Sequence, residues 1–418
     1  MLKRLETLLK TGFFHIFGAS VVNKIVTFLS AIVLVRIISK DEYGVFSYAW
    51  NIYSFILLLS GLGITSGVLQ LCSEKYADTH IQIKIYQFGL RFGTLVNIGL
   101  AIVIVICSIF IPLRISGSNA VLLYLCFLPL LSLWQDLQLV FIRCKRQNKI
   151  YAYLSTISTV IYAAFTIIGA YSYEVKGLIV GRYISGLCFL FVSICIFKTP
   201  FFEKTEHYIE KKEVNDILKI SLISMLNNGL SQILYLADVF VIGLVLAESV
   251  EVASYKVATQ IPNALSFIPV AAVTYVYPYF AEHKNDKAWC MKKYMQLVGY
   301  FGLLNLLIST FLIIFAPLIV SILFDAQYLD AVPAFRILSL SYFFSGTFRV
   351  ISGNLLVTQR KLRFNTFVAV LSGIVNVVAD YLFISLWGSI GAALATILVV
   401  ILSSVLSTFY LLKIFKEK

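Results

Sequence analysis

The chain has 418 residues, of which 60% are hydrophobic and only 13% are charged, and its formal net charge is +13. A soluble domain has about 25% charged residues, so this composition and a mean hydropathy of +0.89 exclude a soluble globular protein. They also exclude a soluble nucleic-acid-binding protein, although the basic excess alone would suggest one. The values are typical of a protein whose helices cross a membrane many times.

About twelve apolar segments follow one another along the chain, and each is long enough to cross a bilayer as a helix. The predicted spans are residues 13–38, 45–70, 92–112, 120–142, 151–173, 177–197, 217–246, 252–280, 294–324, 332–358, 364–386 and 390–412. The sequence therefore predicts an all-α integral membrane fold with short loops.

The longest polar stretch lies in the middle of the chain and divides the predicted spans into six and six. We interpret residues 199–216 as a cytoplasmic linker between an N-terminal lobe, residues 1–198, and a C-terminal lobe, residues 217–418. An even number of helices in each lobe makes the two lobes parallel repeats, so a substrate is expected to pass between them.

Weak internal similarity supports this duplication. Residues 42–49 align with residues 251–258, and residues 175–181 align loosely with residues 389–395. The first pair follows the first span of each lobe, and the second pair opens its last span. The repeat therefore extends over whole lobes.

Basic residues are concentrated in alternate loops. With a cytoplasmic N-terminus, about 25 Lys and Arg residues lie in cytoplasmic segments and about 3 outside, and this asymmetry predicts that both termini are cytoplasmic. Six basic residues fall inside predicted spans. They are Lys24, Arg36, Arg182, Lys256, Arg336 and Arg349.

Two of these embedded basic residues, Lys24 and Arg349, lie near the middle of their spans. A charge at that depth costs at least a few kcal/mol, so both are expected to face a substrate cavity rather than lipid. Arg36, Arg182 and Arg336 lie near outer ends of spans, where snorkelling to the membrane surface is favoured over a role in guiding phosphate.

Polar side chains form a stripe on each of two neighbouring spans. The stripe of the seventh span contains Ser224, Asn227, Ser231, Tyr235 and Asp238, and that of the eighth contains Lys256, Gln260, Asn263 and Thr274. We expect the two stripes to line one cavity. Pro262 and Pro269 are expected to kink the eighth span.

Asp238 and Asp380 are the embedded carboxylates best placed to bind and release a proton or a sodium ion. Asp380 shares a helix face with Gly373 and Asn376. The alternative for Asp238 is a structural ion pair with Lys256 that only fixes helix register. With Asp136, the embedded acids number three against six embedded bases, and this cationic interior suits a diphosphate head group.

Other cofactors are not indicated by the sequence. It contains no G-x-x-x-x-G-K-[ST] loop, so the sequence gives no indication that this chain uses ATP directly. The His and Cys residues lack metal-ligand spacing. Gly61-Leu62-Gly63 lies inside a span, where close helix packing or a local bend is its expected use.

Several segments resemble those of a known family. Residues 34–46 with Gly61-Leu62-Gly63 resemble the N-terminal signature of the polysaccharide-transport family, which belongs to the multidrug/oligosaccharidyl-lipid/polysaccharide (MOP) exporter superfamily. Similar later landmarks are residues 237–243, 260–264, 277–278 and 388–396. The resemblance covers essentially the whole chain, and its motifs specify the superfamily better than the substrate.

The resemblance implies a MOP/MATE-like fold and the function of a Wzx-type flippase. Such a protein moves undecaprenyl-pyrophosphate-linked oligosaccharide repeat units across the bacterial cytoplasmic (inner) membrane for O-antigen, lipopolysaccharide or capsule assembly. Its implied partners are the undecaprenyl-diphosphate-linked oligosaccharide, membrane lipids and polysaccharide polymerase machinery, and it is not an enzyme.

Three other functions stay open at this point. A multidrug exporter or a peptidoglycan-precursor flippase of the same superfamily would share the fold. A membrane enzyme such as a polymerase or glycosyltransferase ranks last, because the predicted external loops of about 4 to 10 residues are too short to hold acceptor and catalytic groups.

Overall fold

The protein is described by a computed structural model that covers residues 13–75, 78–201 and 209–416. Side chains are described throughout these ranges except at Phe13, Phe14, Leu230, Ser231 and Leu234. Within the ranges all regular secondary structure is helical. The predicted all-α membrane fold is therefore confirmed.

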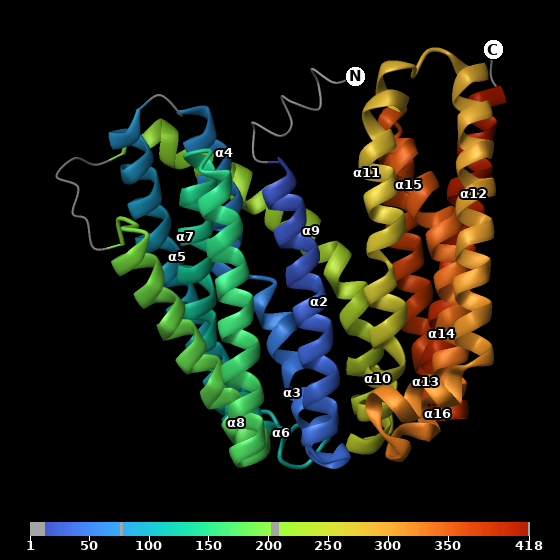
Figure 1. The fold of residues 1–418 in the computed structure, drawn as a ribbon, viewed down its shortest axis with the longest axis horizontal. Helices are drawn as coiled ribbons and strands as arrows, with labels where there is room; N and C mark the ends of the chain where they lie inside the picture. Colours follow the sequence, from blue (N-terminus) through green and yellow to red (C-terminus); the bar gives the residue numbers. More distant parts are fainter. Residues whose placement is uncertain (1–12, 76–77, 202–208, 417–418) are drawn as a thin grey trace. The chain divides into compact units, whose positions relative to one another are not determined.

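Contacts divide the chain into two compact units, Met1–Ile233 and Leu234–Lys418, here called the N-terminal unit and the C-terminal unit. The helices of the N-terminal unit (Figure 1) are α2 (Phe13–Ile37), α3 (Lys40–Leu57), the 3-10 helix η1 (Ser60–Gly63), α4 (Ile64–Glu74), α5 (Thr79–Phe110), α6 (Ser118–Tyr124), α7 (Leu128–Cys144), α8 (Asn148–Phe191), the π-helix η2 (Val192–Ile196) and the first part of α9 (Lys211–Val245).

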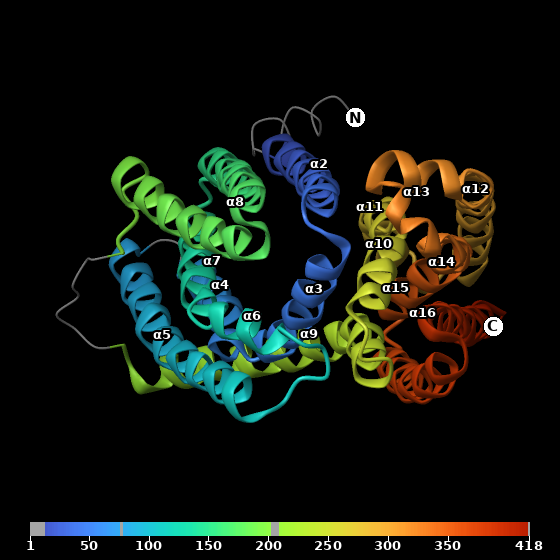
Figure 2. The same cartoon turned by 90° about the horizontal axis from the view of Figure 1, so that it is seen from below.

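The C-terminal unit contains the rest of α9 and the helices that follow it. They are α10 (Ser249–Leu265), α11 (Phe267–Glu282), α12 (Lys287–Ile314), α13 (Ala316–Phe324), the 3-10 helix η3 (Ala326–Ala331), α14 (Val332–Phe344), the π-helix η4 (Ser345–Arg349), α15 (Val350–Thr358) and α16 (Leu362–Lys416). Figure 2 shows α12, α14 and α16 packed beside one another in this unit.

All twelve expected spans fall on described helices. Six of these helices are long and apolar enough to cross a membrane, and two bent pairs, α3 with α4 and α6 with α7, pass the same test. Of the six, α8 and α16 each contain a sharp kink and cover two expected spans. The eighth span is interrupted at Ser266 between α10 and α11, close to the two prolines that predicted a kink.

The boundary between the units lies inside α9, whereas the sequence suggested the linker 199–216. The helix already begins at Lys211. Its first part packs on α4, because a Cβ on Gly67 would lie 2.5 Å from the Ile217 carbonyl oxygen and 2.3 Å from the Ser221 hydroxyl. Contacts therefore assign this part to the N-terminal unit, and the expected lobe limits stay a prediction.

The break between α3 and α4 occurs at Gly61-Leu62-Gly63. All three residues have positive φ, at 52°, 48° and 75°, and the two helices are bent by 42°. Asn97 of α5 satisfies the broken backbone: its Oδ1 accepts from the Gly61 N–H at 2.7 Å, and its Nδ2 donates to the Pro129 carbonyl at 2.7 Å. The expected local bend is thus confirmed.

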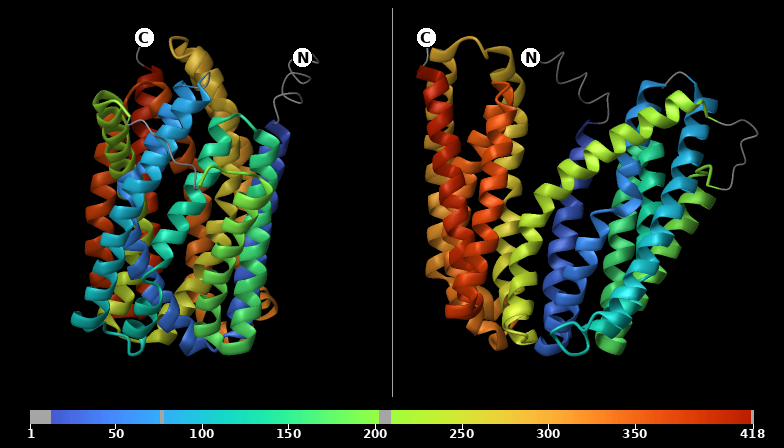
Figure 3. Two further views of the ribbon diagram at one scale, coloured as in Figure 1. Left: turned by 90° about the vertical axis from the view of Figure 1, so that its left-hand side faces the viewer. Right: turned by 180° about the vertical axis from the view of Figure 1, so that it is seen from behind.

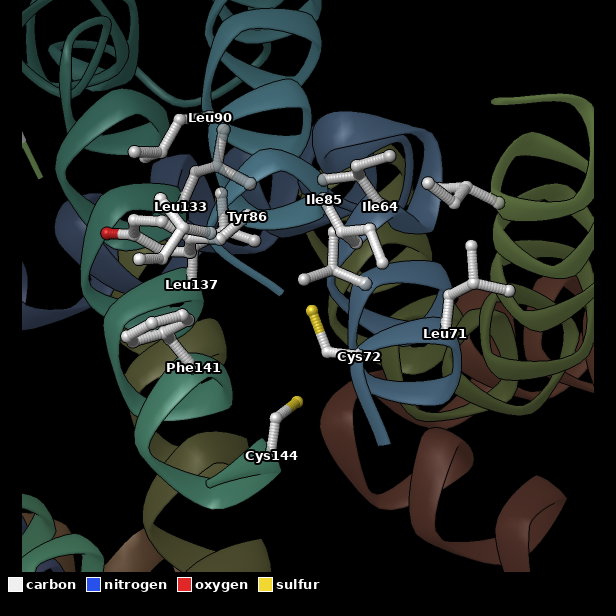
Figure 4. Close-up of a cluster of buried hydrophobic side chains, with 13 residues drawn as sticks. Ile64, Leu71, Cys72, Ile85, Tyr86, Leu90, Leu133, Leu137, Phe141 and Cys144 are labelled. Carbon is white, nitrogen blue, oxygen red and sulfur yellow. The ribbon is translucent and has the colours of Figure 1, made fainter. Parts of the chain in front are cut away.

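Each unit has its own apolar core. In the N-terminal unit a cluster around Ile64, Leu71, Tyr86 and Leu137 packs α4 against α5 and α7 (Figure 4). In the C-terminal unit a second cluster joins α11, α12, α15 and α16, and the buried Tyr294 lies in it. These cores hold the membrane-spanning helices of each unit in fixed positions.

The kinks in α8 and α16 turn each helix back on itself (Figure 3). Glu174 has φ 48° and ψ −130°, and Gly388 has φ 59° and ψ −142°. Just after each kink the two arms touch. A Cβ on Gly177 would lie 1.9 Å from the Gly169 carbonyl oxygen, and a Cβ on Gly391 would lie 2.0 Å from that of Phe383.

Candidate functional site

Two carboxyl groups of the C-terminal unit lie near each other inside its helices. Asp238 is on the last part of α9, and Asp380 is on the first arm of α16. The Asp380 side chain is 0% exposed, and the two carboxyl groups are close enough to interact directly. The two embedded acids singled out in the sequence therefore belong to one site, which we call the carboxyl site.

Three donors from two other elements hold Asp238. Its Oδ2 accepts from the Tyr255 hydroxyl at 2.5 Å and from the Thr396 hydroxyl at 2.8 Å. Its Oδ1 accepts from the Asn376 side-chain amide at 3.3 Å. Tyr255 belongs to α10, and Asn376 and Thr396 belong to the two arms of α16. These three hydrogen bonds thus fix the position of the Asp238 carboxyl group.

Asp380 has no comparable support. Both of its carboxyl oxygens are enclosed, and neither has a hydrogen-bond partner among the described residues. A buried carboxylate without partners is costly, and a second carboxylate beside it adds repulsion. A proton shared between the two groups, or a cation bound between them, removes both penalties.

The chemistry of the surrounding atoms fits a small hard cation. Carboxylate, hydroxyl and amide oxygens are ligands of that kind, and they are the groups that meet here. In the ranges that the structure describes, no three His, Cys, Asp or Glu side chains gather as a divalent transition-metal site would require. Oxygen atoms of this kind can hold a proton or a hard cation.

Lys256 does not neutralise this site by direct pairing. It follows Tyr255 on α10 and acts electrostatically on Asp238. Among the described residues, however, the hydrogen-bond partners of Asp238 are Tyr255, Thr396 and Asn376, and no ion pair joins it to Lys256. The alternative of a structural Asp238–Lys256 ion pair is therefore not formed in this conformation.

The remaining residues of the predicted substrate cavity lie in both units, and their shared cavity stays a prediction. In the N-terminal unit, Lys24 on α2 and Asn227 on α9 are exposed. In the C-terminal unit, Asn263 is exposed and Gln260 is half-buried. Ser231 lies on α9, but its side chain is outside the described part of the structure.

Arg349 ends the π-helix η4 and is half-buried. It acts electrostatically on Tyr235, which is 66% exposed on the last part of α9. The extra residue in a π-turn shifts the side chains that follow it around the helix. The π-helical turn therefore determines the direction in which the Arg349 side chain points. Its place in a substrate path stays a prediction.

Tyr255 and Thr396 were missed by the sequence reasoning. Hydroxyl residues are common in membrane helices, and neither is part of the polar stripes. Thr396 does end the family-like segment 388–396, and Tyr255 lies within the internal repeat at 251–258. Their places in the family-like segment and in the internal repeat are the sequence features that could have identified these two residues.

Comparisons with solved structures show the fold. An inward-facing multidrug resistance MATE family transporter of the MOP superfamily aligns with a TM-score of 0.73 and 15% identity over 95% of this chain and 96% of its own. The lipid II flippase MurJ, in an inward closed conformation, aligns with a TM-score of 0.72 and 16% identity over 96% of this chain and 88% of its own. An outward-facing MATE transporter gives a TM-score of 0.61 and 12% identity over 97% of each chain.

Among curated proteins, no sequence matches this chain. The sequence profile of a family described as polysaccharide biosynthesis protein matches residues 33–333, which is well over half of the chain. With the MOP-like fold of its two helical units, the chain belongs to the polysaccharide biosynthesis protein family.

Proposed function

We propose that this protein is a flippase that moves undecaprenyl-pyrophosphate-linked oligosaccharide units from the cytoplasmic to the outer leaflet of a bacterial inner membrane. The family supports a role in polysaccharide production. The fold supports transport, because solved structures that share it include transporters and a lipid II flippase. The two units alternate between inward-open and outward-open states, and the polyprenyl tail stays in lipid.

The observation that carries the transport proposal is the carboxyl site. Two neighbouring carboxyl groups, one of them completely buried without a partner among the described residues, lie on α9 and α16 inside two of the predicted spans. Intramembrane carboxylates of this kind mark ion and proton pathways. The inward movement of a proton or sodium ion through Asp238 and Asp380 supplies the free energy for flipping.

The substrate class is supported by charge. Lys24 and Arg349 provide cations within the predicted spans, and the diphosphate of a lipid-linked sugar is negatively charged. Charge-assisted hydrogen bonds from Lys and Arg to phosphate are stronger than hydrogen bonds between neutral groups. A cationic drug, the substrate of a multidrug exporter, would instead require a more acidic path.

Complementation of a deletion strain tests this function. Cells without the gene should lose surface polysaccharide and accumulate lipid-linked oligosaccharide in the inner leaflet. Lys24→Ala and Arg349→Ala variants, present at wild-type levels, should each fail to restore the polymer because the diphosphate loses a cationic partner. Lys24→Arg should restore more activity than Lys24→Ala.

The matched control is Arg336→Ala, which removes an exposed arginine of α14 that donates to the Ile313 carbonyl. Normal polymer in both the Lys24 and Arg349 alanine variants would remove these residues from the substrate path. Drug sensitivity without loss of polymer in the deletion strain would favour a multidrug exporter, and loss of viability would favour a peptidoglycan-precursor flippase.

A further inference from the structure

Arg182 lies among aromatic rings of the N-terminal unit. It is on the second arm of α8, eight residues after the kink at Glu174. Its guanidinium carbon is 3.8 Å from the ring centre of Trp50, 4.9 Å from that of Phe46 and 5.5 Å from that of Tyr162. These rings hold the guanidinium in place by cation–π contact, so Arg182 does not snorkel freely to the membrane surface.

The guanidinium has no anionic partner among the described residues. Its Nε and Nη1 are enclosed and have no hydrogen-bond partner there. The ionisable groups that act on it electrostatically are tyrosine hydroxyls and include no carboxyl group. Because burying an unpaired charge is costly, a protein retains such an arrangement most readily where a ligand completes it. Arg182 as a whole is half-buried, so part of its side chain remains accessible.

The internal repeat shows which position Arg182 occupies. Glu174 and Gly388 are 214 residues apart and share nearly the same unusual backbone angles. The two close backbone contacts, Gly177 with Gly169 and Gly391 with Phe383, are related by the same offset. This offset places Arg182 at the position of Thr396, which is a member of the carboxyl site.

The neighbours of Arg182 follow the same correspondence. Tyr162 takes the position of Asn376 at the offset of 214 residues. Phe46 takes the position of Tyr255 at the offset of 209 residues that relates 42–49 to 251–258. The contacts are also repeated, because Thr396 meets Tyr255 in one unit and Arg182 meets Phe46 in the other. The two groups of residues are therefore repeats of one site.

Their charges are opposite. The positions of Asp380 and Asp238 are occupied in the N-terminal unit by Thr166 and Leu29, so both carboxyl groups are missing. The Thr396 hydroxyl is replaced by a guanidinium. The C-terminal copy holds two acids and needs a cation, whereas the N-terminal copy holds one base and needs an anion.

We propose that Arg182, supported by Phe46, Trp50 and Tyr162, is a binding site for a phosphate oxyanion in the N-terminal unit. The site is the repeat counterpart of the carboxyl site. Its identification with the phosphate of the transported lipid rests on the proposed function. An anionic phospholipid head group offers the same chemistry and is the other source of such a phosphate.

Binding measurements on the purified full chain in an uncharged detergent test this site. The probes are geranylgeranyl diphosphate, the neutral alcohol geranylgeraniol and phosphatidylglycerol. Arg182→Gln should weaken binding of the diphosphate at least about tenfold, since charge-assisted hydrogen bonds are lost. Arg182→Lys should bind less tightly than wild type, because lysine keeps the charge but not the planar fork. The alcohol should bind equally to all variants.

Arg336→Gln is the matched control and should bind the diphosphate as wild type does. Wild-type affinity of Arg182→Gln for the diphosphate, with a lower melting temperature, would overturn the site and assign Arg182 to packing. If Arg182→Gln does not fold, the Arg182→Lys variant tests the site instead. Wild-type affinity of Arg182→Lys for the diphosphate would also overturn the site.

The probes separate this site from the proposed function. The wild-type protein could bind phosphatidylglycerol and the diphosphate with equal affinity, and Arg182→Gln could lose both. That result would uphold the anion site and count against a lipid-linked sugar as its ligand. Tight binding of the diphosphate that does not depend on Arg182 would reject the site and leave the flippase function standing.

Discussion

Asp380 shows how one residue can be costly to the fold and informative about function. Its oxygens are buried without partners beside a second carboxyl group, whereas Asp238 has three donors. Both acids could be identified in the sequence because ionisable residues inside apolar spans are rare and usually functional. Tyr255 and Thr396 could not, since only the packing of α10 and α16 brings their hydroxyls to Asp238.

Replacing each acid by its amide should change stability in opposite directions. Asp380→Asn removes a buried carboxyl group that has no hydrogen-bond partner among the described residues, and it should raise the melting temperature in buffer without sodium or other alkali ions. Asp238→Asn weakens an acceptor of three hydrogen bonds. It should lower the free energy of unfolding by about 1–3 kcal/mol, and the melting temperature with it. Any stabilisation by added sodium or by acid should disappear in both variants.

Differential scanning fluorimetry of the purified protein measures these shifts. Asp286→Asn is the control, because Asp286 caps α12 through the Trp289 N–H and asparagine caps equally well. A lower melting temperature in Asp380→Asn, with the sodium or proton response retained, would show that Asp380 is a structural residue.

At the scale of elements, the hairpins of α8 and α16 depend on close backbone contact. The sequence predicted two spans in each place, because length and hydropathy specify a span. It could not predict their tight junctions: Glu174 adopts a positive φ that usually favours glycine. The bend at Gly61-Leu62-Gly63 was predictable because glycines mark it, whereas the unit boundary inside α9 depends on contacts that leave no local pattern.

Adding a methyl group at these junctions should destabilise the hairpins. Gly177→Ala and Gly391→Ala would place a Cβ 1.9 and 2.0 Å from a facing carbonyl oxygen, so the arms must separate. We expect a loss of about 1–3 kcal/mol in each case, seen as a lower melting temperature and a lower protein level. Gly99→Ala, where nothing lies within 4 Å, is the control and should match wild type. Unchanged stability of both junction variants would contradict the packing of these hairpins.

At the scale of the whole molecule, the distribution of basic residues predicts the topology. Lys and Arg outnumber Asp and Glu by 34 to 21, and the excess lies in segments assigned to the cytoplasm. Alkaline phosphatase fused after Glu210, just before α9, should therefore be inactive. A matched fusion after Arg114, between α5 and α6, should be active because that loop is expected outside. The reverse result would overturn the topology and the direction of transport inferred from it.

In the proposed mechanism, a cation moving through the carboxyl site drives the flipping of a lipid-linked oligosaccharide. The most direct test is transport of a fluorescent polyprenyl-diphosphate oligosaccharide in proteoliposomes, with an imposed sodium or proton gradient. Wild-type protein should flip the lipid faster when a sodium gradient or a proton gradient is imposed than when no gradient is present. Asp238→Asn and Asp380→Asn should still bind the lipid but lose the acceleration. Equal, gradient-dependent flipping by wild type and both variants would contradict the account.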